Sequence, residues 1–294
     1  MSENLSLNAA FEAASGHVTY NMTNDYMFRA VLQKNNYVLK GLISSLLHIP
    51  FEEIESVEIT NPIMLGDTVT EKEMRLDINV ILNNSHLINL EMQVANYFNW
   101  HNRSISYLCR SFDQLNKGEN YLSAKPVIHI GFLDFSLEER TPEFYSTYKL
   151  INIKNHEVYS DNLTLSVVDL NQIKLATDED KTYHIDYWAS LFKADSWEVI
   201  KMLAEKDNYI KEASKTIFEL TSDEMIQKRC RDREEYYLDK RAMERIMKEK
   251  DLQITRQKDQ LVIKDTQLIE KDNIIAEKDN QIAALKAQLA KSQK

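Results

Sequence analysis

Two acidic residues, Asp77 and Glu91, interrupt apolar runs in the segment MRLDINVILNNSHLINLEMQ, residues 74–93. The segment is typical of two strands that are joined by the turn NNS. If Leu82 faces His86 across that turn, the ladder places Asp77 opposite Glu91. Opposed side chains point to the same face of a sheet, with their Cβ atoms about 5 Å apart. The spacing therefore predicts a pair of neighbouring carboxylates.

Neighbouring carboxylates repel each other, and a divalent cation between them removes that cost. Mg²⁺ takes oxygen ligands, commonly one or two carboxylates together with water and substrate phosphate. A cation held in this way can polarise a phosphodiester and activate a water molecule. Gln93 shares the face of Glu91 and can orient a water or a phosphate oxygen, although it carries no charge.

An edge hairpin accounts for the same two acids without a metal. Acidic side chains on the exposed face of an edge strand protect it against aggregation. Arg75, on the face of Asp77, could also pair with one of the acids. The pattern by itself leaves both interpretations open.

The elements that must position these residues follow from hydrophobic periodicity. In residues 74–82 the apolar side chains alternate on one face, with Asp77 and Asn79 on the other; in residues 86–93 the second face carries Asn89, Glu91 and Gln93. The other predicted elements are helices over 23–35, 35–50 and 96–116, the last ended by Gly118, strands over 56–62, 125–135, 147–153 and 163–170, and helices after 182.

Composition limits the class of protein. The chain has 294 residues and is 43% hydrophobic, which is enough for a substantial core, and only 5 Gly and 4 Pro favour long regular elements. The net charge is −10, and it is −12 without the tail Lys248–Lys294. A generic nucleic-acid binder is usually basic, so contact with nucleic acid would need a local basic patch or a metal.

The sequence shows neither a recognisable targeting signal nor a pattern of reactive or paired cysteines. The N-terminus lacks the basic start and apolar core of a secretory signal, and no apolar run approaches the ~20 residues that span a bilayer. Two cysteines cannot form a disulfide framework, and Cys109 is expected to be buried in a helix without a partner histidine. These features predict a cytoplasmic protein that does not associate with membranes.

The tail has a seven-residue repeat. Ile254, Leu261, Leu268, Ile275, Ile282 and Leu289 recur at that interval, and the pair Lys-Asp recurs beside them. The repeat resembles a coiled coil, but the second apolar position is adjacent, as at Val262, and lysines occupy the usual second seam position. A solvated helix, a homo-oligomer formed through a weak coiled coil and a specific outside partner all remain open.

The stretches NDYMFRAVL (24–32), RLDINVIL (75–82), INLEMQ (88–93), RSISYLCRSFDQLNKGENY (103–121) and KPVIHIGFLDF (125–135) follow one another in a specific order. Their pattern D-x13-E-x-Q on a hairpin, followed by a helix, resembles the PD-(D/E)XK nuclease core. The pair Arg103/Tyr107 and the GxxY ending at Tyr121 narrow the resemblance to the recombination-promoting nuclease (Rpn) branch of PD-(D/E)XK nuclease family transposases. The resemblance covers roughly residues 20–195.

The resemblance implies an α/β fold, with a restriction-endonuclease-like core of order αβββαβ in which helices flank a mixed sheet. It also implies cleavage of DNA that depends on Mg²⁺ or Mn²⁺. If the roles of the family's motif residues are transferred to this sequence, Asp77 and Glu91 would be metal ligands together with the backbone carbonyl of Met92. Gln93 stands where the wider family has a lysine, and Asp25 matches an acidic position that can approach the metal. Asp25 is an equally good helix N-cap.

Without the lysine, a positive charge has to come from elsewhere to stabilise the charge that develops on the phosphate. Arg103 and Arg110 on the following helix are candidates. Arg103 and Tyr107 share a helix face, so a cation packed on an aromatic ring explains them equally well. His129, in a predicted core strand, is expected to be an interior histidine with its hydrogen bonds satisfied.

These observations predict a flexible lead-in over 1–20, a nuclease-like domain over 21–195, a helical segment over 196–245 and a coiled-coil-like tail over 246–294. The expected function is a Mg²⁺-dependent DNA endonuclease that acts in recombination, transposition or defence. The alternative is a catalytically weak nuclease-fold protein that interacts through its C-terminal helix, which the negative body charge favours. Cleavage of RNA is a third reading that the acidic pair does not exclude.

Overall fold

The computed structural model describes residues 2–61, 77–113, 115, 119–137 and 141–292. The chain divides into two compact units, Met1–Glu235 and Tyr236–Lys294, and each is described by itself. The part of the first predicted hairpin strand before Asp77, including Arg75, and the predicted helix end at Gly118 lie outside the described residues.

The first unit is built on a six-stranded sheet of order β1-β2-β3-β4-β6-β5. Strands β3, β4 and β6 are parallel neighbours, whereas β1–β2, β2–β3 and β5–β6 pair antiparallel, so the sheet is mixed. The strands are β1 (Val57–Ile59), β2 (Ile78–Leu82), β3 (His86–Gln93), β4 (Val127–Leu133), β5 (Tyr145–Ile151) and β6 (Val158–Asp169). The predicted α/β architecture is confirmed, and the elements from α2 to β4 follow the expected order of helices and strands.

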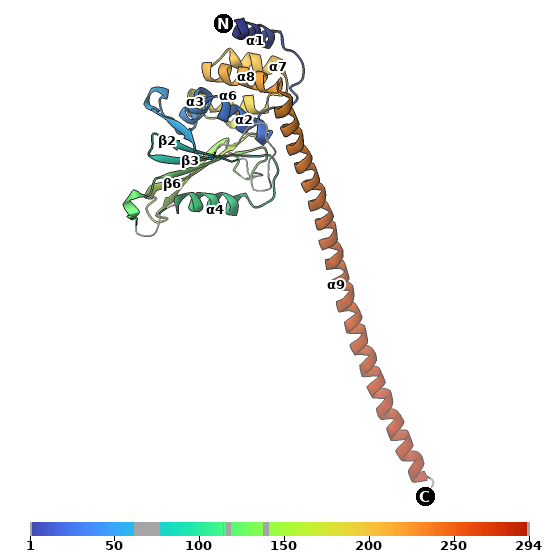
Figure 1. Cartoon of the computed structure of the whole chain (residues 1–294). Coiled ribbons are helices and arrows are strands. Elements are labelled where there is room, and N and C mark those ends of the chain that lie inside the picture. The colour runs from blue at the N-terminus through green and yellow to red at the C-terminus, as the bar shows by residue number, and fades with distance from the viewer. Residues whose placement is uncertain (1, 62–76, 114, 116–118, 138–140, 293–294) are drawn as a thin grey trace. The chain divides into compact units, whose positions relative to one another are not determined.

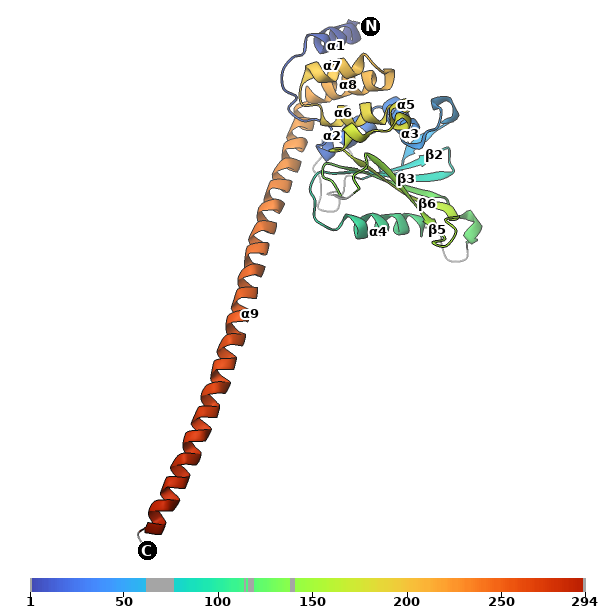
Figure 2. The ribbon, with the colours of Figure 1, turned by 180° about the vertical axis from the view of Figure 1, so that it is seen from behind.

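Helices cover both faces of this sheet. In Figures 1 and 2, α2, α3 and α6 lie on one face, α4 lies on the other, and α7, α8 and α1 are stacked outside the first layer. The helices are α1 (Ser2–Ala13), α2 (Asp25–Lys34), α3 (Asn36–Leu47), α4 (Trp100–Phe112), α5 (Asp178–Thr182), α6 (Ile185–Lys193), α7 (Trp197–Ala204), α8 (Asn208–Thr221) and α9 (Glu224–Ser292), with 3₁₀ turns at Phe51–Glu53, Tyr121–Ser123 and Ile173–Leu175.

The β2–β3 hairpin has the predicted register. Leu82 pairs with His86 and Ile78 pairs with Leu90, across a turn in which Asn83 and Asn84 adopt positive φ angles. Asparagine tolerates that left-handed conformation better than most residues, which explains why this sequence turns here. The register was predictable because a slip of one residue would move every apolar side chain of β2 to the other face.

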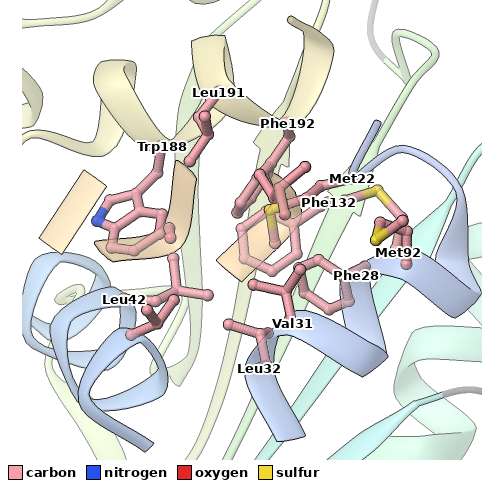
Figure 3. Packing of buried hydrophobic residues seen from close by; sticks show 14 of the residues in the cluster. Met22, Phe28, Val31, Leu32, Leu42, Met92, Phe132, Trp188, Leu191 and Phe192 are labelled. Atoms are coloured by element: carbon pink, nitrogen blue, oxygen red, sulfur yellow. The ribbon is translucent and has the colours of Figure 1, made fainter. Parts of the chain in front are cut away.

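The main core lies between the sheet and the layer α2, α3 and α6. Figure 3 shows Phe28 and Val31 of α2 beside Phe132 of β4 and Phe192 of α6. The ring of Phe28 lies 5.4 Å from that of Phe132 and 5.6 Å from that of Phe192. β4 is almost fully buried, as its continuous apolar sequence predicts, because it has parallel neighbours on both sides and helices on both faces.

Asparagines cap the first two helices of this layer. The side chain of Asn24 accepts hydrogen bonds from the N–H groups of Tyr26 and Met27, and Asn35 does the same for α3. Asp25 is therefore the first residue of α2 and not its N-cap, contrary to one of the two sequence-based interpretations. Its carboxylate is used elsewhere.

The first residues are not the loose lead-in that the sequence suggested. They form α1, whose Phe11 is buried against Trp197 and Phe218, with ring centroids 6.4 Å and 5.7 Å apart. Aromatic contacts with two distant helices, α7 and α8, and hydrogen bonds from Lys201 hold this segment, so periodicity within α1 gave little indication of it.

Helices α7 and α8 belong to the same compact unit as the sheet. The expected limit near residue 195 therefore does not separate two compact units, and α9 runs without interruption past the expected limit near 245. The finer domain limits stay a prediction. None of the helices in the described part of the chain has the length and apolar character that a bilayer crossing needs.

Asp25 forms a buried ion pair that joins the two ends of the first unit. The Arg233 guanidinium donates to both Asp25 carboxylate oxygens, from Nε to Oδ1 over 2.9 Å and from Nη2 to Oδ2. Both side chains are buried, at 4% and 6% exposed. The pair links α2 to the start of α9, so it fixes the last helix of the unit against the first core helix.

We expect Asp25→Ala to lower the free energy of unfolding by about 3 kcal/mol, because the Arg233 charge is left buried without its partner. Urea denaturation of the full chain measures this. The double variant Asp25→Leu/Arg233→Met removes both charges and should recover at least half of the loss. Equal losses in the two variants would show that the ion pair does not determine stability here.

Candidate functional site

The face of the sheet under α4 is polar although it is buried. Asn89, Glu91 and Gln93 of β3 alternate on this face, and His129 of β4 lies directly beside Asn89 in the parallel register. Each of the four is at most 5% exposed. Apolar residues on this face would give an ordinary core, so this concentration of buried polar groups marks it as a candidate site.

Glu91 is the charged centre of this face. Its Oε1 lies 2.5 Å from Nη2 of Arg103 on α4, and its Oε2 lies 3.8 Å from Nε2 of His129. The Glu91 side chain is 5% exposed and that of Arg103 is 31% exposed. The Arg103 side chain therefore reaches solvent while the carboxylate does not, so a partly exposed positive charge compensates a buried negative one.

Asp77 lies directly before β2 and is held through its backbone. Its carbonyl oxygen accepts from the Arg29 guanidinium of α2 and, over 3.0 Å, from the amide of Asn61. Arg29 also donates to the Asn61 carbonyl, and Asn61 Oδ1 accepts from the N–H of Asn79 over 2.9 Å. These bonds extend the pairing of β1 and β2 and fix the point at which Asp77 enters the sheet.

The Asp77 carboxylate turns toward β3. Oδ2 accepts a 3.1 Å hydrogen bond from Nδ2 of Asn89, whose amide also donates to Oδ1 of Asn79 over 2.6 Å. One further step of the β2–β3 register places Asp77 opposite Glu91, on the face that carries Asn89. The structure thus places both predicted acids on the same face of neighbouring strands, each with its own polar partners.

Gln93 continues this face toward the end of β3. Its Nε2 donates to the Ala95 carbonyl over 2.9 Å, and its backbone carbonyl accepts from the N–H of Asp134 over 3.0 Å. Its side-chain orientation is therefore fixed by the local backbone. Met92, between Glu91 and Gln93, directs its side chain into the opposite core.

An aromatic group closes the site on the α4 side. The Arg103 guanidinium lies 5.2 Å from the ring centroid of Tyr107, and the rings of Tyr107 and Trp100 lie 5.9 Å and 5.7 Å from that of His129. Gly131 makes this packing possible, because a Cβ at that position would lie 2.1 Å from the Trp100 ring. Arg103 and Tyr107 share a helix face as predicted, and the cation packs on the aromatic ring while it also contacts Glu91. The role of Arg103 at a phosphate stays a prediction.

His129 is buried, as predicted, but the expectation that its hydrogen bonds are satisfied is wrong. Neither ring nitrogen has a hydrogen-bond partner among the described residues. Burial, and secondarily the Arg103 charge, lowers the pKa of His129 from 6.5 to about 4. The imidazole is therefore neutral at pH 7, and it lines the Glu91 carboxylate with a weakly polar surface.

The remaining predicted residues fall outside this group. Arg110 is exposed in the last turn of α4, and Cys109, expected to be buried, is also exposed. Asp25 pairs with Arg233, which gives it a structural role; its expected support of a metal stays a prediction. A groove lined by Thr60, Asn79, Asn89 and Ser111 opens on this face of the sheet.

The donor set suits a hard cation. Asp77 and Glu91 provide carboxylate oxygens from adjacent strands, and such ligands match Mg²⁺ or Mn²⁺ better than a soft metal. Within the described ranges no cluster of three or more His, Cys, Asp or Glu side chains has the geometry of a metal centre. Two carboxylates and a backbone carbonyl would leave coordination positions for water and substrate, which is usual for Mg²⁺.

The sequence did not reveal the residues that hold the site residues in place through contacts between separate segments. Arg29 lies in a fully buried stretch of α2, and a charged residue among apolar neighbours was the available signal. Asn61 and Asn89 were visible as polar residues at a strand end and on the acidic face. Arg233 is separated from Asp25 by 208 residues, so no local pattern could pair them.

A family model described as PD-(D/E)XK nuclease family transposase matches residues 22–245. The match extends about 50 residues beyond the region expected from the motifs, and it includes the helix α8 and the start of α9. Neither the curated proteins nor the solved structures include a significant match to the chain. The family expected from the sequence is thereby confirmed.

The neutral His129 predicts a pH-dependent stability. The unfolded chain binds a proton at this histidine below pH 6.5, whereas the folded chain does so only near pH 4, so stability is complete above 6.5 and decreases as the pH falls toward 4. The loss between pH 7.5 and pH 5 should be about 2 kcal/mol larger in the wild type than in His129→Gln. Urea denaturation at both pH values measures it, and parallel losses would contradict the assignment.

Proposed function

Because the chain belongs to the PD-(D/E)XK nuclease family transposases, we propose that it is a Mg²⁺-dependent endonuclease that hydrolyses phosphodiester bonds in DNA. Mn²⁺ is expected to replace Mg²⁺. The proposed context is recombination, transposition or defence, of which the description of the family names only transposition, through the word transposase. It takes Asp77, Glu91 and Gln93 as the catalytic residues.

One observation carries the proposal. Asp77, which is half-buried, and Glu91, which is buried, stand on the same face of this hairpin, where neighbouring carboxylates repel each other. Arg29, Asn61 and Asn89 are all engaged in fixing that hairpin. A fold that needed only a stable sheet would gain from apolar residues at these positions.

Asp77, Glu91 and the carbonyl of Met92 would hold the metal. When bound, Mg²⁺ supplies charge neutralisation at the phosphate and an activated water. Gln93, oriented by its hydrogen bond to Ala95, presents a neutral side chain beside Glu91 that can position a water or phosphate oxygen.

Arg103 would provide the positive charge that Gln93 lacks. Its guanidinium contacts Glu91, and the Arg103 side chain as a whole is 31% exposed, so a phosphate can approach this side chain from solvent. Guanidinium groups bind phosphate oxygens through paired N–H donors. Stacking on Tyr107 limits the orientations of the side chain, whose donors are directed toward Glu91.

The alternative function, a catalytically weak protein that interacts through its C-terminal helix, draws support from the charge. The chain carries −10 overall, which opposes approach of DNA unless a cation offsets the field. DNA binding measured with and without Ca²⁺ discriminates the two, because a cation-dependent site should bind DNA only when the cation is present. The expected cytoplasmic location and the preference for DNA over RNA stay predictions.

We expect Asp77→Ala to abolish plasmid nicking, a loss of about a thousand-fold or more, while the fold is retained. The exposed acid Glu58 on the neighbouring strand β1 provides the matched control Glu58→Ala, which should nick like the wild type. Purified full-length proteins are compared in Mg²⁺ and in EDTA, with circular dichroism as the test of folding. Nicking by Asp77→Ala at the wild-type rate would contradict the site assignment.

Arg103→Gln should slow the single-turnover cleavage rate by about a hundred-fold, because a charge that stabilises the transition state is removed. Arg110→Gln is its matched control, since Arg110 lies on the same helix but is exposed at its end. Arg103→Lys should recover part of the rate. An equal effect of the Arg103→Gln and Arg110→Gln variants would indicate general electrostatic attraction of DNA instead of a role at the site.

A further inference from the structure

The second compact unit is a single helix with a line of exposed apolar residues among those that the structure describes. Its residues from Tyr236 onward continue α9 to Ser292. The apolar line of this helix consists of Ile254, Leu261, Leu268, Ile275 and Ile282, which are each 47% to 58% exposed. Residues seven apart stay on one side of a helix that supercoils, so the line forms a continuous stripe that can be buried only against another molecule or another copy.

Charges of opposite sign border this stripe. The lysine flank consists of Lys264, Lys271 and Lys278, each three residues after a member of the apolar line; the aspartate flank consists of Asp265, Asp272 and Asp279, each four residues after it. Positions at +3 and +4 lie on opposite sides of the starting residue, each rotated by about 50° in a helix of 3.5 residues per turn. One border of the apolar line is therefore positive and the other is negative.

These charges are not used within the helix itself. Neither flank has a residue of opposite charge three or four positions away, the spacing at which side chains on one helix meet. Among the described residues, no ion pair involves a member of either flank. The two flanks are thus available to a partner along three successive turns of the repeat.

The arrangement of the flanks favours a second copy of this helix as the partner, and it favours parallel over antiparallel packing of the two helices. When two copies of this helix pack in parallel, the symmetry axis along them brings the positive border of one against the negative border of the other. In an antiparallel pair, positive meets positive and negative meets negative, which is destabilising. A seam centred on Val262 and Ile269 instead would have aspartates on one border, at Asp265 and Asp272, and uncharged residues on the other. The aspartates would then lack a lysine of the other copy to pair with.

We propose that residues 247–286 form a parallel, in-register two-stranded coiled coil with a second copy of this chain. Each lysine of the lysine flank meets the aspartate that follows it in sequence on the other copy, so Lys264 pairs with Asp265 of the partner copy. With one apolar residue per heptad at its centre, the seam is narrow and the association is weak. The proposal is independent of the nuclease function.

A parallel pair joins the two tails at the same end. Each tail continues at its N-terminal end into its own nuclease-like unit, because α9 is a single helix. Both nuclease-like units are therefore connected to the same end of the paired tails.

Charge exchange between the flanks tests the pairing. The acidic variant replaces the lysine flank (Lys264→Glu, Lys271→Glu and Lys278→Glu), and the basic variant replaces the aspartate flank (Asp265→Lys, Asp272→Lys and Asp279→Lys). Sedimentation equilibrium of the full chain should show a wild-type dimer at micromolar concentrations. Each variant alone should dimerise about ten-fold more weakly or worse, and an equimolar mixture of the two should restore dimers.

Helix content by circular dichroism confirms that the variants remain folded. A wild-type chain that stays monomeric throughout this concentration range would overturn the proposal, as would variants that dimerise as tightly as the wild type. Salt at about 1 M should weaken the wild-type dimer, because exposed ion pairs are screened.

Disulfide trapping tests the direction. In a Cys109→Ser background, Ile282→Cys on the apolar line should cross-link two parallel copies on oxidation, whereas antiparallel copies hold these positions far apart. Cys230 remains in place because it is buried, and burial raises the pKa of its thiol. Asn280→Cys, on the opposite side of the helix, is the matched control and should not cross-link. Equal cross-linking of both variants, or none at residue 282 while dimers are present, would overturn the parallel arrangement.

Discussion

A buried carboxylate in the middle of a sheet is the constraint on which the rest of this structure depends. Glu91 lies on β3, which has an antiparallel neighbour on one side and a parallel neighbour on the other, and α4 covers it. Burial of an uncompensated charge would cost a large part of the free energy of unfolding of a small domain. The surrounding residues reflect this cost: Arg103 brings a positive charge to the carboxylate, and His129 stays neutral beside it.

The same constraint explains how the two faces of the sheet differ. The face toward α2, α3 and α6 is apolar and carries the main core, so it can hold the strands rigidly. Arg29 reaches from that layer to the backbone of Asp77 and thereby connects the rigid core to the acidic face. Positioning through the backbone leaves the Asp77 carboxylate directed toward Glu91's strand, where it contacts Asn89.

The hairpin and its acidic pair could be predicted because they depend on local rules. Alternation decides which residues of β2 and β3 share a face, and the turn decides the register, so Asp77 and Glu91 follow from the sequence between them. Arg103 and Tyr107 were predictable for the same reason, since a helix places residues four apart on one face. In these elements the information lies within a few residues.

Contacts between distant segments were not predictable in this way. The helix α1 is held by Phe11 against α7 and α8, and Asp25 meets Arg233 from the far end of the unit. His129 looked like an ordinary core residue, and only the positions of α4 and Glu91 show that its ring nitrogens have no hydrogen-bond partner among the described residues. Tertiary packing decides the roles of such residues, and the periodicity of a single helix or strand does not indicate which distant residues it will contact.

The central proposal for this protein is that Asp77 and Glu91 together bind a divalent cation. Electron paramagnetic resonance of Mn²⁺ titrated with the full chain measures this binding without any nucleic acid. The wild type should bind Mn²⁺ and so lower the resonance signal of free Mn²⁺, and added Mg²⁺ should compete for the site and restore that signal. The double variant Asp77→Asn/Glu91→Gln should leave the signal of free Mn²⁺ unchanged. Equal uptake by the two folded proteins would contradict the assignment of the acidic pair as the metal site.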